Sequence, residues 1–479
     1  MLVALAAACR AQPGGEQASN AAAFAPVETR TLKWFGAAGD GRADDTAALE
    51  RAFAHSDRYC LDGGGGRYRV VGTLRVSNSL CLRNAVLVQS ARPADTSPYI
   101  VRRCPAVPDP VAVVDCNDPA VPADKLAGLW ESLSIRTLLI RPEGDHPIQV
   151  SLERVKIDRG PYAEQGSRSD SAGVWLDGAD RVDMRDVEIT GNGKGYGLQI
   201  TNSRNISLDN LWVHDLVWAP YRGDQPLTQS RVAAMGWNSV PIHEFREQRP
   251  GGAKIAKFYG VRIQEQLTCV SLANVSHVTI RNVRIERCMA RFDTGDVPWQ
   301  ADGLDIGQSS SDITVNSASI DSTWEGMDVV GGGNGIDRLQ IDGLTVSNAF
   351  SFGLKMGYSV HDARVSHLKV NGAGLSGVVL YGPVRDVRIA EASIGNIGTI
   401  HGSRGDYSPW PPGNRAGIRI DSSGGSSPED VVIQDVSVSG RPSQFEFGIL
   451  NTGGRRVQLS DFRAGGYGTE RARGLAGPE

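Results

Sequence analysis

The stretch that decides the fold is Val278-Thr279-Ile280-Arg281-Asn282-Val283-Arg284-Ile285, which is apolar at its first, third, sixth and eighth positions. Alternation between the first and third positions, and again between the sixth and eighth, is the periodicity of a β-strand with one buried face. The two residues between the third and sixth positions interrupt this alternation. The stretch therefore predicts two short strands joined by a bend.

The same eight-residue pattern recurs in ten copies, which is too regular to be chance. The copies are residues 150–157, 182–189, 206–213, 278–285, 313–320, 339–346, 363–370, 387–394, 431–438 and 457–464. Each copy is expected to form two sides of one coil in a repeating structure.

A second signature, Gly-apolar-x-apolar, precedes most copies. Its glycines are Gly173, Gly197, Gly303, Gly326, Gly353, Gly377, Gly417 and Gly448, and Cys269 takes the equivalent place once. Three short strands in each coil, with a period near 24 residues, are typical of a β-helix. A leucine-rich repeat has a similar period, but its asparagine and leucine positions are missing. We therefore predict an all-β fold, a right-handed parallel β-helix (solenoid), whose core extends with every coil.

The N-terminal part of the repeat region begins with a distinctive motif, Phe35-Gly-Ala-Ala-Gly-Asp-Gly-Arg-Ala-Asp-Asp-Thr46. It resembles the FGAxGDGxxDDT motif of the pectate-lyase superfamily, in which a strand leads into a short capping helix. The resemblance implies a β-helix over residues 31–479, with an N-terminal cap over residues 31–60. Asp45 is expected to be the N-cap of a helix over residues 46–54, whose apolar face covers the first coil. Because this superfamily contains hydrolases, lyases, epimerases and phage tailspikes, the motif does not select an activity.

Residues 1–30 predict export. The apolar run Leu2–Ala8 ends in Cys9 and resembles the lipobox of a bacterial lipoprotein, and residues 11–29 have the composition of a flexible tether. A cleaved signal peptide is the alternative. The protein is expected at the outer membrane as a lipoprotein, or in the periplasm or extracellular space, with a lipid anchor at Cys9 as its one link to a membrane.

Cysteines and charge agree with export and exclude some partners. Six cysteines remain beside Cys9, and pairing of sequence neighbours gives the bridges 60–81, 104–116 and 269–288. No CxxC or metal-ligand histidine spacing is present, so neither a metal nor another cofactor is expected. The net charge of −4 without a basic stripe excludes nucleic acid as the main partner.

Candidate catalytic residues follow from stacking the glycine signatures. In Gly-apolar-x-apolar the x residue faces away from the core, so Asp305, Asp328 and Lys355 are predicted on consecutive rungs of one outward ladder. Asp302 and Glu325 precede two of the glycines and form a neighbouring column. Four carboxylates this close raise at least one pKa, while the lysine holds another ionised. Such a division supplies the acid and the base of glycoside hydrolysis.

A second resemblance points the same way. Gln300-Ala-Asp302-Gly-Leu-Asp305 is similar to the Asn-Thr-Asp-Gly-Ile-Asp motif of polygalacturonase-type hydrolases, which implies a catalytic role for Asp302. Glu325 stands where that family has the second carboxylate of Asp-Asp-Cys. The His-Gly and Arg-Ile-Lys motifs are replaced by Phe352-Gly and by the segment 377–381. The resemblance therefore implies a related hydrolase that acts on a glycan other than galacturonan.

Long insertions interrupt the coils at residues 214–260 and 401–416. These loops carry aromatic and basic side chains, and so do Trp299 and several positions on the coils. Such side chains are suited to stack on sugars and to pair with acidic groups. The predicted substrate-binding residues are Trp237, His243, Arg246, Trp299, Trp324, Tyr381, Tyr407, Trp410 and Arg419.

Three functions are compatible with this pattern. The first is an exported glycoside hydrolase with Asp302, Glu325, Asp305 and Asp328 as the acid and base set and Lys355 as an orienting group. The second is a polysaccharide lyase or epimerase, in which Lys355, Arg419, Tyr381 or loop histidines act and a calcium ion sits among the aspartates. The third is a non-catalytic polysaccharide-binding or adhesion protein. The pattern selects neither the sugar and linkage nor an oligomeric state.

Overall fold

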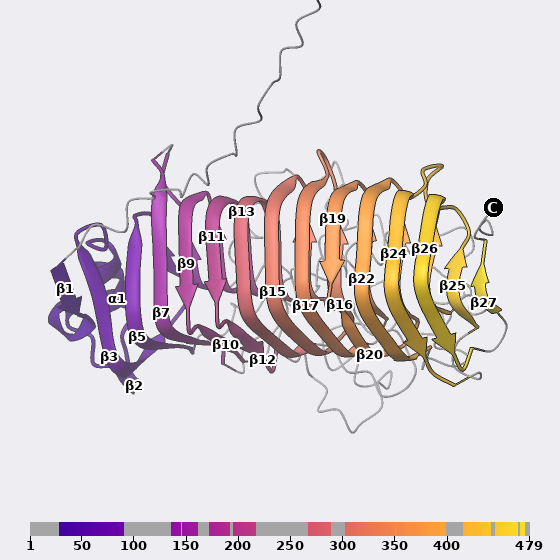
Figure 1. Ribbon diagram of the computed structural model, residues 1–479. Coiled ribbons are helices and arrows are strands. Elements are labelled where there is room, and N and C mark those ends of the chain that lie inside the picture. The colour runs from indigo at the N-terminus through magenta and orange to yellow at the C-terminus, as the bar shows by residue number, and fades with distance from the viewer. Residues whose placement is uncertain are drawn as a thin grey trace, which may run out of the picture.

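The computed structural model describes residues 28–90, 136–144, 146–160, 172–191, 195–216, 267–288, 302–349, 351–398, 415–441, 446–467 and 470–474. Its 27 strands form one continuous sheet in which all the paired strands run parallel. Strands on the near side of Figure 1 run downward, and the chain returns behind them one step further along, which is a right-handed coil. The predicted right-handed parallel β-helix is confirmed.

The glycine signatures form one column of strands, which we call the glycine face. Its strands are β4 (Leu74–Val76), β6 (Arg136–Ile140), β8 (Ala172–Asp177), the start of β11 (Gly195–Asp209), the start of β13 (Leu267–Cys288), β14 (Asp302–Gly307), β16 (Glu325–Val330), β18 (Phe352–Gly357), β21 (Ser376–Tyr381), β23 (Ala416–Asp421), β25 (Phe447–Asn451) and β27 (Glu470–Arg473).

The eight-residue copies form the other two sides of the coils. They lie in β7 (Ile148–Asp158), β9 (Ala179–Arg185) with β10 (Glu188–Thr190), β11 with β12 (Trp212–His214), β13, β15 (Ser310–Thr323), β17 (Ile336–Ala349), β19 (Val360–Ser366) with β20 (Lys369–Ala373), β22 (Val384–Ile397), β24 (Glu429–Ser439) and β26 (Arg455–Gly465).

The bend inside each copy has a single backbone cause. The fifth residue of all ten copies is in the left-handed region, with φ between 49° and 73°. One such residue turns the chain and lets alternation restart on the next side of the coil. Asn282 and Asp186 suit this conformation, whereas Arg154 and Glu391 are held in it by the coils on either side.

The core is one continuous stack of the apolar positions. In the copy that opens the sequence analysis, Ile280 and Ile285 are fully buried, and Ile280 pairs in register with Val315 of the next coil. The signature glycine follows from this packing: a Cβ at Gly303 would lie 2.5 Å from the carbonyl oxygen of Gly326. Each glycine therefore allows two coils to approach at a corner.

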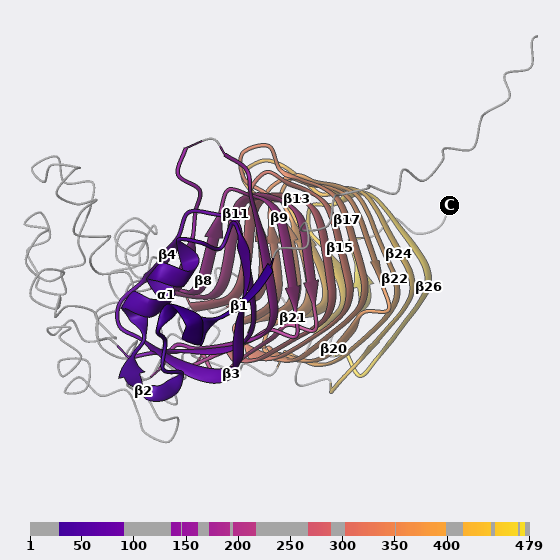
Figure 2. The ribbon, with the colours of Figure 1, turned by 90° about the vertical axis from the view of Figure 1, so that its left-hand side faces the viewer.

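The N-terminal cap consists of β1 (Glu28–Thr31), a 3-10 turn (Leu32–Phe35), β2 (Asp40–Asp44) and α1 (Thr46–Phe53), followed by β3 (Tyr59–Val70) and β5 (Leu80–Gln89). In Figure 2 these elements lie across the near end of the coil stack. Leu49, Ala52 and Phe53 of α1 are buried in the core, as predicted.

Asp45 occupies the N-cap position of α1, as predicted. Its side chain makes no capping hydrogen bond to α1 and instead accepts from the backbone N–H groups of Ala38 and Gly39, at 2.6 and 3.2 Å. Asp44 accepts from Thr46 N at 3.0 Å and so serves the start of the helix. In the motif, Asp44 thus binds the first residue of the helix, and Asp45 binds the preceding turn.

Two of the three predicted disulfides are present. Cys60 and Cys81 pair across adjacent coils, with Cα atoms 4.6 Å apart, and Cys269 and Cys288 close a single coil, with Cα atoms 6.0 Å apart. Cys104, Cys116 and the predicted export segment with Cys9 lie outside the described residues. No helix in the described part of the chain is long and apolar enough to cross a membrane.

Candidate active site

The predicted outward ladder is confirmed by the strand register. Asp305 on β14 pairs with Ser271 on β13 and with Asp328 on β16, and Asp328 pairs with Lys355 on β18. The corner column is equally aligned, because Asp302 pairs with Glu325. We call Asp302, Asp305, Glu325 and Asp328 the acid cluster.

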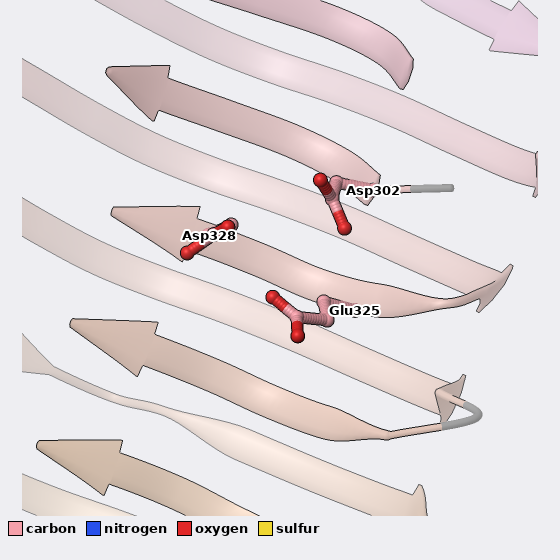
Figure 3. A group of neighbouring side chains, drawn as sticks. All are labelled: Asp302, Glu325 and Asp328. Carbon is pink, nitrogen blue, oxygen red and sulfur yellow. The ribbon is translucent and has the colours of Figure 1, made fainter. Parts of the chain in front are cut away.

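The side chains of the acid cluster converge on one side of the glycine face. One oxygen each of Asp302, Glu325 and Asp328 lies within 4.8 Å of the others, and Figure 3 shows these three carboxyl groups on β14 and β16. Asp305 accepts a hydrogen bond from the Ser271 hydroxyl at 2.9 Å.

Lys355 neutralises part of this charge. Its Nζ lies 2.9 Å from Asp328 Oδ2 and also donates to Glu325 Oε2. The side chains of Lys355, Glu325 and Asp328 are only 11%, 5% and 6% exposed, so these ion pairs are shielded from water. Lys355 thus links the carboxylates of two different columns.

Burial raises the pKa values of three carboxyl groups of the acid cluster. It raises the pKa of Asp302 well above its usual range, and the charges of Glu325 and Asp328 add to this shift. Burial also raises the pKa of Asp305 to about 7, with a contribution from Asp328. It raises the pKa of Glu325 to about 7 as well, against the opposing charge of Lys355. Protonated and ionised carboxyl groups therefore lie side by side near neutral pH.

Lys355 itself remains a cation. Burial alone lowers the pKa of a lysine, but here the charges of Asp328 and Glu325 outweigh it and hold the pKa well above its usual range. A proton on Lys355 keeps the partly buried acid cluster from carrying uncompensated negative charge.

The outward ladder is less exposed than strand alternation predicts. Val379 and Leu450 occupy ladder positions on β21 and β25, yet they are 0% and 2% exposed. Each belongs to a small apolar cluster separate from the coil core, Val379 with Phe352 and Leu450 with Phe447. Toward the C-terminal coils, two apolar rungs therefore flank the polar rung of Arg419.

Three of the predicted substrate-binding residues are described, and all three are buried. Trp324 is 8% exposed and packs in the main hydrophobic core, so little of its side chain is open to a sugar. Arg419 is 5% exposed and forms an ion pair with Asp421. Tyr381 is 6% exposed and interacts electrostatically with Lys355. The other predicted substrate-binding residues, Trp237, His243, Arg246, Trp299, Tyr407 and Trp410, lie outside the described residues.

The sequence did not predict a functional role for two further residues, Ser271 and Tyr358. Ser271 orients Asp305, and its place on the ladder was a usable signal. Tyr358 follows β18 and packs its ring edge-on against Tyr381, with centroids 4.8 Å apart. No periodicity in the sequence marks that position.

Asp302, Glu325 and Asp328 could supply oxygen ligands to a hard cation such as Ca²⁺. The ammonium group of Lys355 already contacts two of the three carboxylates, however. The charge that a metal would bring is therefore provided in part by the protein itself.

No protein-family model and no curated protein matches this sequence. Among solved structures, the A-module of the mannuronan C-5 epimerase AlgE4 of Azotobacter vinelandii is 14% identical, with a TM-score of 0.47, over 94% of this chain and 98% of that one. PfbA, a surface adhesin of Streptococcus pneumoniae, is 11% identical, with a TM-score of 0.46, over 93% of each chain. The family 28 exopolygalacturonase of Yersinia enterocolitica is 10% identical, with a TM-score of 0.45, over 95% of this chain and 79% of that one. An epimerase, an adhesin and a hydrolase are thus similar to the same degree. The right-handed parallel β-helix follows from the chain's own strands, and likeness at this level selects no activity.

Proposed function

We propose that this protein is a polysaccharide-active enzyme, and specifically a glycoside hydrolase that works through the acid cluster. The observation that carries the proposal is the convergence of Asp302, Glu325 and Asp328 beside Lys355 on one face. Glycoside hydrolysis needs one carboxyl group that gives a proton and a second that stays ionised. The cluster offers both within a few ångströms.

Asp302 is assigned the role of general acid, because its raised pKa keeps a proton available near neutral pH. Asp328, in its ion pair with Lys355, is assigned the role of the second carboxylate. Glu325 contacts the same ammonium group, and one of its oxygens lies within 4.8 Å of an oxygen of each of the other two carboxyl groups. Asp305, held by Ser271, supports the ladder position of Asp328.

A lyase or epimerase is the second candidate, and the described residues favour it less. That chemistry removes a proton next to a uronate carboxyl group and needs an unprotonated base. The pKa of Lys355 is raised, which keeps it protonated, and burial raises the pKa of Tyr381, which keeps its hydroxyl neutral. Arg419 is held by Asp421. A base for this reaction would have to come from residues other than these three.

Export completes the proposal. Two disulfides link cysteines of adjacent coils and of a single coil, and such bonds persist in oxidising compartments. A polymer outside the cell is the substrate that this location would present. A lipid anchor at Cys9 remains the proposed form of attachment, with an ordinary cleaved signal peptide as its alternative.

The test is a screen of the purified full chain on acidic and neutral polysaccharides from bacteria and plants. New reducing ends and the ultraviolet absorbance of unsaturated uronates are followed together. Reducing ends without absorbance, lost in Asp302→Asn, support the hydrolase, whereas both signals rising together identify a lyase. Binding without either signal, unchanged in Asp302→Asn, would assign the protein as a binder instead.

A further inference from the structure

Tyr358 directly follows β18, the strand that carries Lys355. Its residue exposure is 50%, which places it among the few large hydrophobic side chains exposed in the described part of the chain, with Trp34 and Val71. Its backbone has φ of 50°, in the left-handed region. A bulky side chain rarely occupies that region, although in this fold Arg154 and Glu391 also do so at the bends of the coils.

The neighbouring coils show what the turn requires. Gly357 pairs with Val330 of the preceding coil and with Tyr381 of the following one, so the residues equivalent to Tyr358 are Gly331 and Gly382. Gly382 has φ of 69°, where glycine is unstrained. Gly331 is outside the left-handed region, but an added Cβ there would lie 2.2 Å from the carbonyl oxygen of Ser359. Glycine thus occupies the turn in both adjacent coils, for two different reasons, and a tyrosine occupies it in this coil alone of the three.

A series of packing and electrostatic interactions links this tyrosine to the acid cluster. The ring of Tyr358 meets that of Tyr381 edge to face, with an interplanar angle of 83°. Tyr381 in turn packs directly on Gly357, where an added Cβ would lie 2.3 Å from its ring carbons. Tyr381 and Lys355 also interact electrostatically, and Lys355 binds Glu325 and Asp328.

These contacts orient the exposed ring. Tyr381 is fixed by burial and by the close approach of the Gly357 backbone. Its edge-to-face contact therefore fixes the plane of Tyr358 and leaves half of that residue open to solvent. An oriented, half-exposed aromatic ring beside a carboxylate cluster is suited to stack on the apolar face of a sugar ring.

We propose that Tyr358 is a sugar-stacking subsite, which binds the apolar face of a pyranose unit of the polysaccharide adjacent to the unit held at the acid cluster. The proposal rests on the proposed function and names a binding residue for the same site. It explains why the turn keeps a strained tyrosine where both flanking coils have glycine. Tyr381 is the supporting residue, since it touches both the ring of Tyr358 and the backbone of Gly357.

The experiment compares full-length Tyr358→Gly and Tyr358→Phe with wild type on polygalacturonate, alginate and xyloglucan, by affinity electrophoresis and by reducing-end kinetics. Gln308→Gly is the matched control, because Gln308 follows β14 at the equivalent turn and also has positive φ, 39°. For Tyr358→Gly we expect KM to rise about 3- to 10-fold with kcat within about 2-fold. Its thermal midpoint should match wild type, because relief of the left-handed strain offsets the lost contact with Tyr381. Tyr358→Phe and Gln308→Gly should bind like wild type.

The possible outcomes separate this proposal from the proposed function. Cleavage by wild type with an unchanged KM in Tyr358→Gly overturns the stacking subsite and leaves the hydrolase standing. An equal loss in Tyr358→Phe shows that the hydroxyl, and not the ring face, contacts the sugar, and this also overturns stacking. Absence of binding and cleavage by wild type on all three polysaccharides overturns both.

Discussion

Replacement of Lys355 by methionine tests the electrostatic design of the acid cluster. Methionine keeps most of the length of the lysine stem but removes the ammonium group, so Glu325 and Asp328 lose the cation that contacts both. Because all three side chains are nearly buried, water cannot replace that charge. Removal of one partner of a buried ion pair lowers the free energy of unfolding by about 3–5 kcal/mol when the remaining charge stays ionised.

The size of the loss should depend on pH, and its sign follows from the pKa shifts. The pKa of Glu325 is about 7 in the folded protein, above its unfolded value, so the folded state holds more protons between roughly pH 4 and 7. Stability therefore falls as pH rises through this window, and loss of Lys355 extends the fall to higher pH. We expect a loss of about 3–5 kcal/mol at pH 8 and a smaller loss at pH 5, where Glu325 is protonated.

The assay is urea unfolding at pH 5 and pH 8, followed by circular dichroism and tryptophan fluorescence. Lys369→Met is the matched control, because Lys369 is exposed on β20 and lies away from the acid cluster. That variant should differ from wild type by less than about 0.5 kcal/mol at either pH. Equal losses for Lys355→Met at pH 5 and pH 8 would refute the reasoning, because a pure packing defect does not depend on carboxyl protonation.

Three further predictions follow from the same geometry. Asp302→Asn should lower kcat at least about 100-fold, as measured by pre-steady-state kinetics. It should change the free energy of unfolding in urea by less than about 1 kcal/mol, because the Asp302 carboxyl group is already protonated and its replacement removes no charge. Asp305→Asn should stabilise the protein above pH 7 and have no such effect at pH 5. The pKa of Asp305 is about 7, so burial destabilises the protein only at a pH where this carboxyl group is ionised. An equal rise of the thermal midpoint at pH 5 and above pH 7 would contradict this reasoning. Joint replacement of Cys269 and Cys288 by alanine should lower the free energy of unfolding by about 3 kcal/mol, as expected for a loop of this length. Reduction of wild type with dithiothreitol opens the Cys60–Cys81 bridge as well, so it should lower the free energy of unfolding by at least as much.

Local patterns in the sequence determined the repeat, the register and the pairing of distant residues. The spacing of apolar residues in 278–285 predicted two strands and a bend, and the structure places the fifth residue, Asn282, in the left-handed region at that bend. Alignment of the glycine signatures predicted that Asp305, Asp328 and Lys355 stack, and their register confirms it. These properties were readable because each coil repeats the same local geometry, so alignment of sequence is also alignment in space.

Only the tertiary structure decided how exposed these residues are and what they touch. Alternation marks a side chain as facing away from the coil core, but it does not show whether that side is solvated, and Val379 and Asp328 prove to be buried. The corner residues carry no periodic signal, so neither the inward direction of Trp324 nor the outward direction of Asp302 could be derived. Likewise, the left-handed conformation of Tyr358 and the contact of Lys355 with two acids depend on neighbours in other coils. The burial and the ion pairs of a residue depend on contacts with residues that are distant in the sequence. For that reason the pKa shifts and ion pairs of the site could be derived only from the stacked coils.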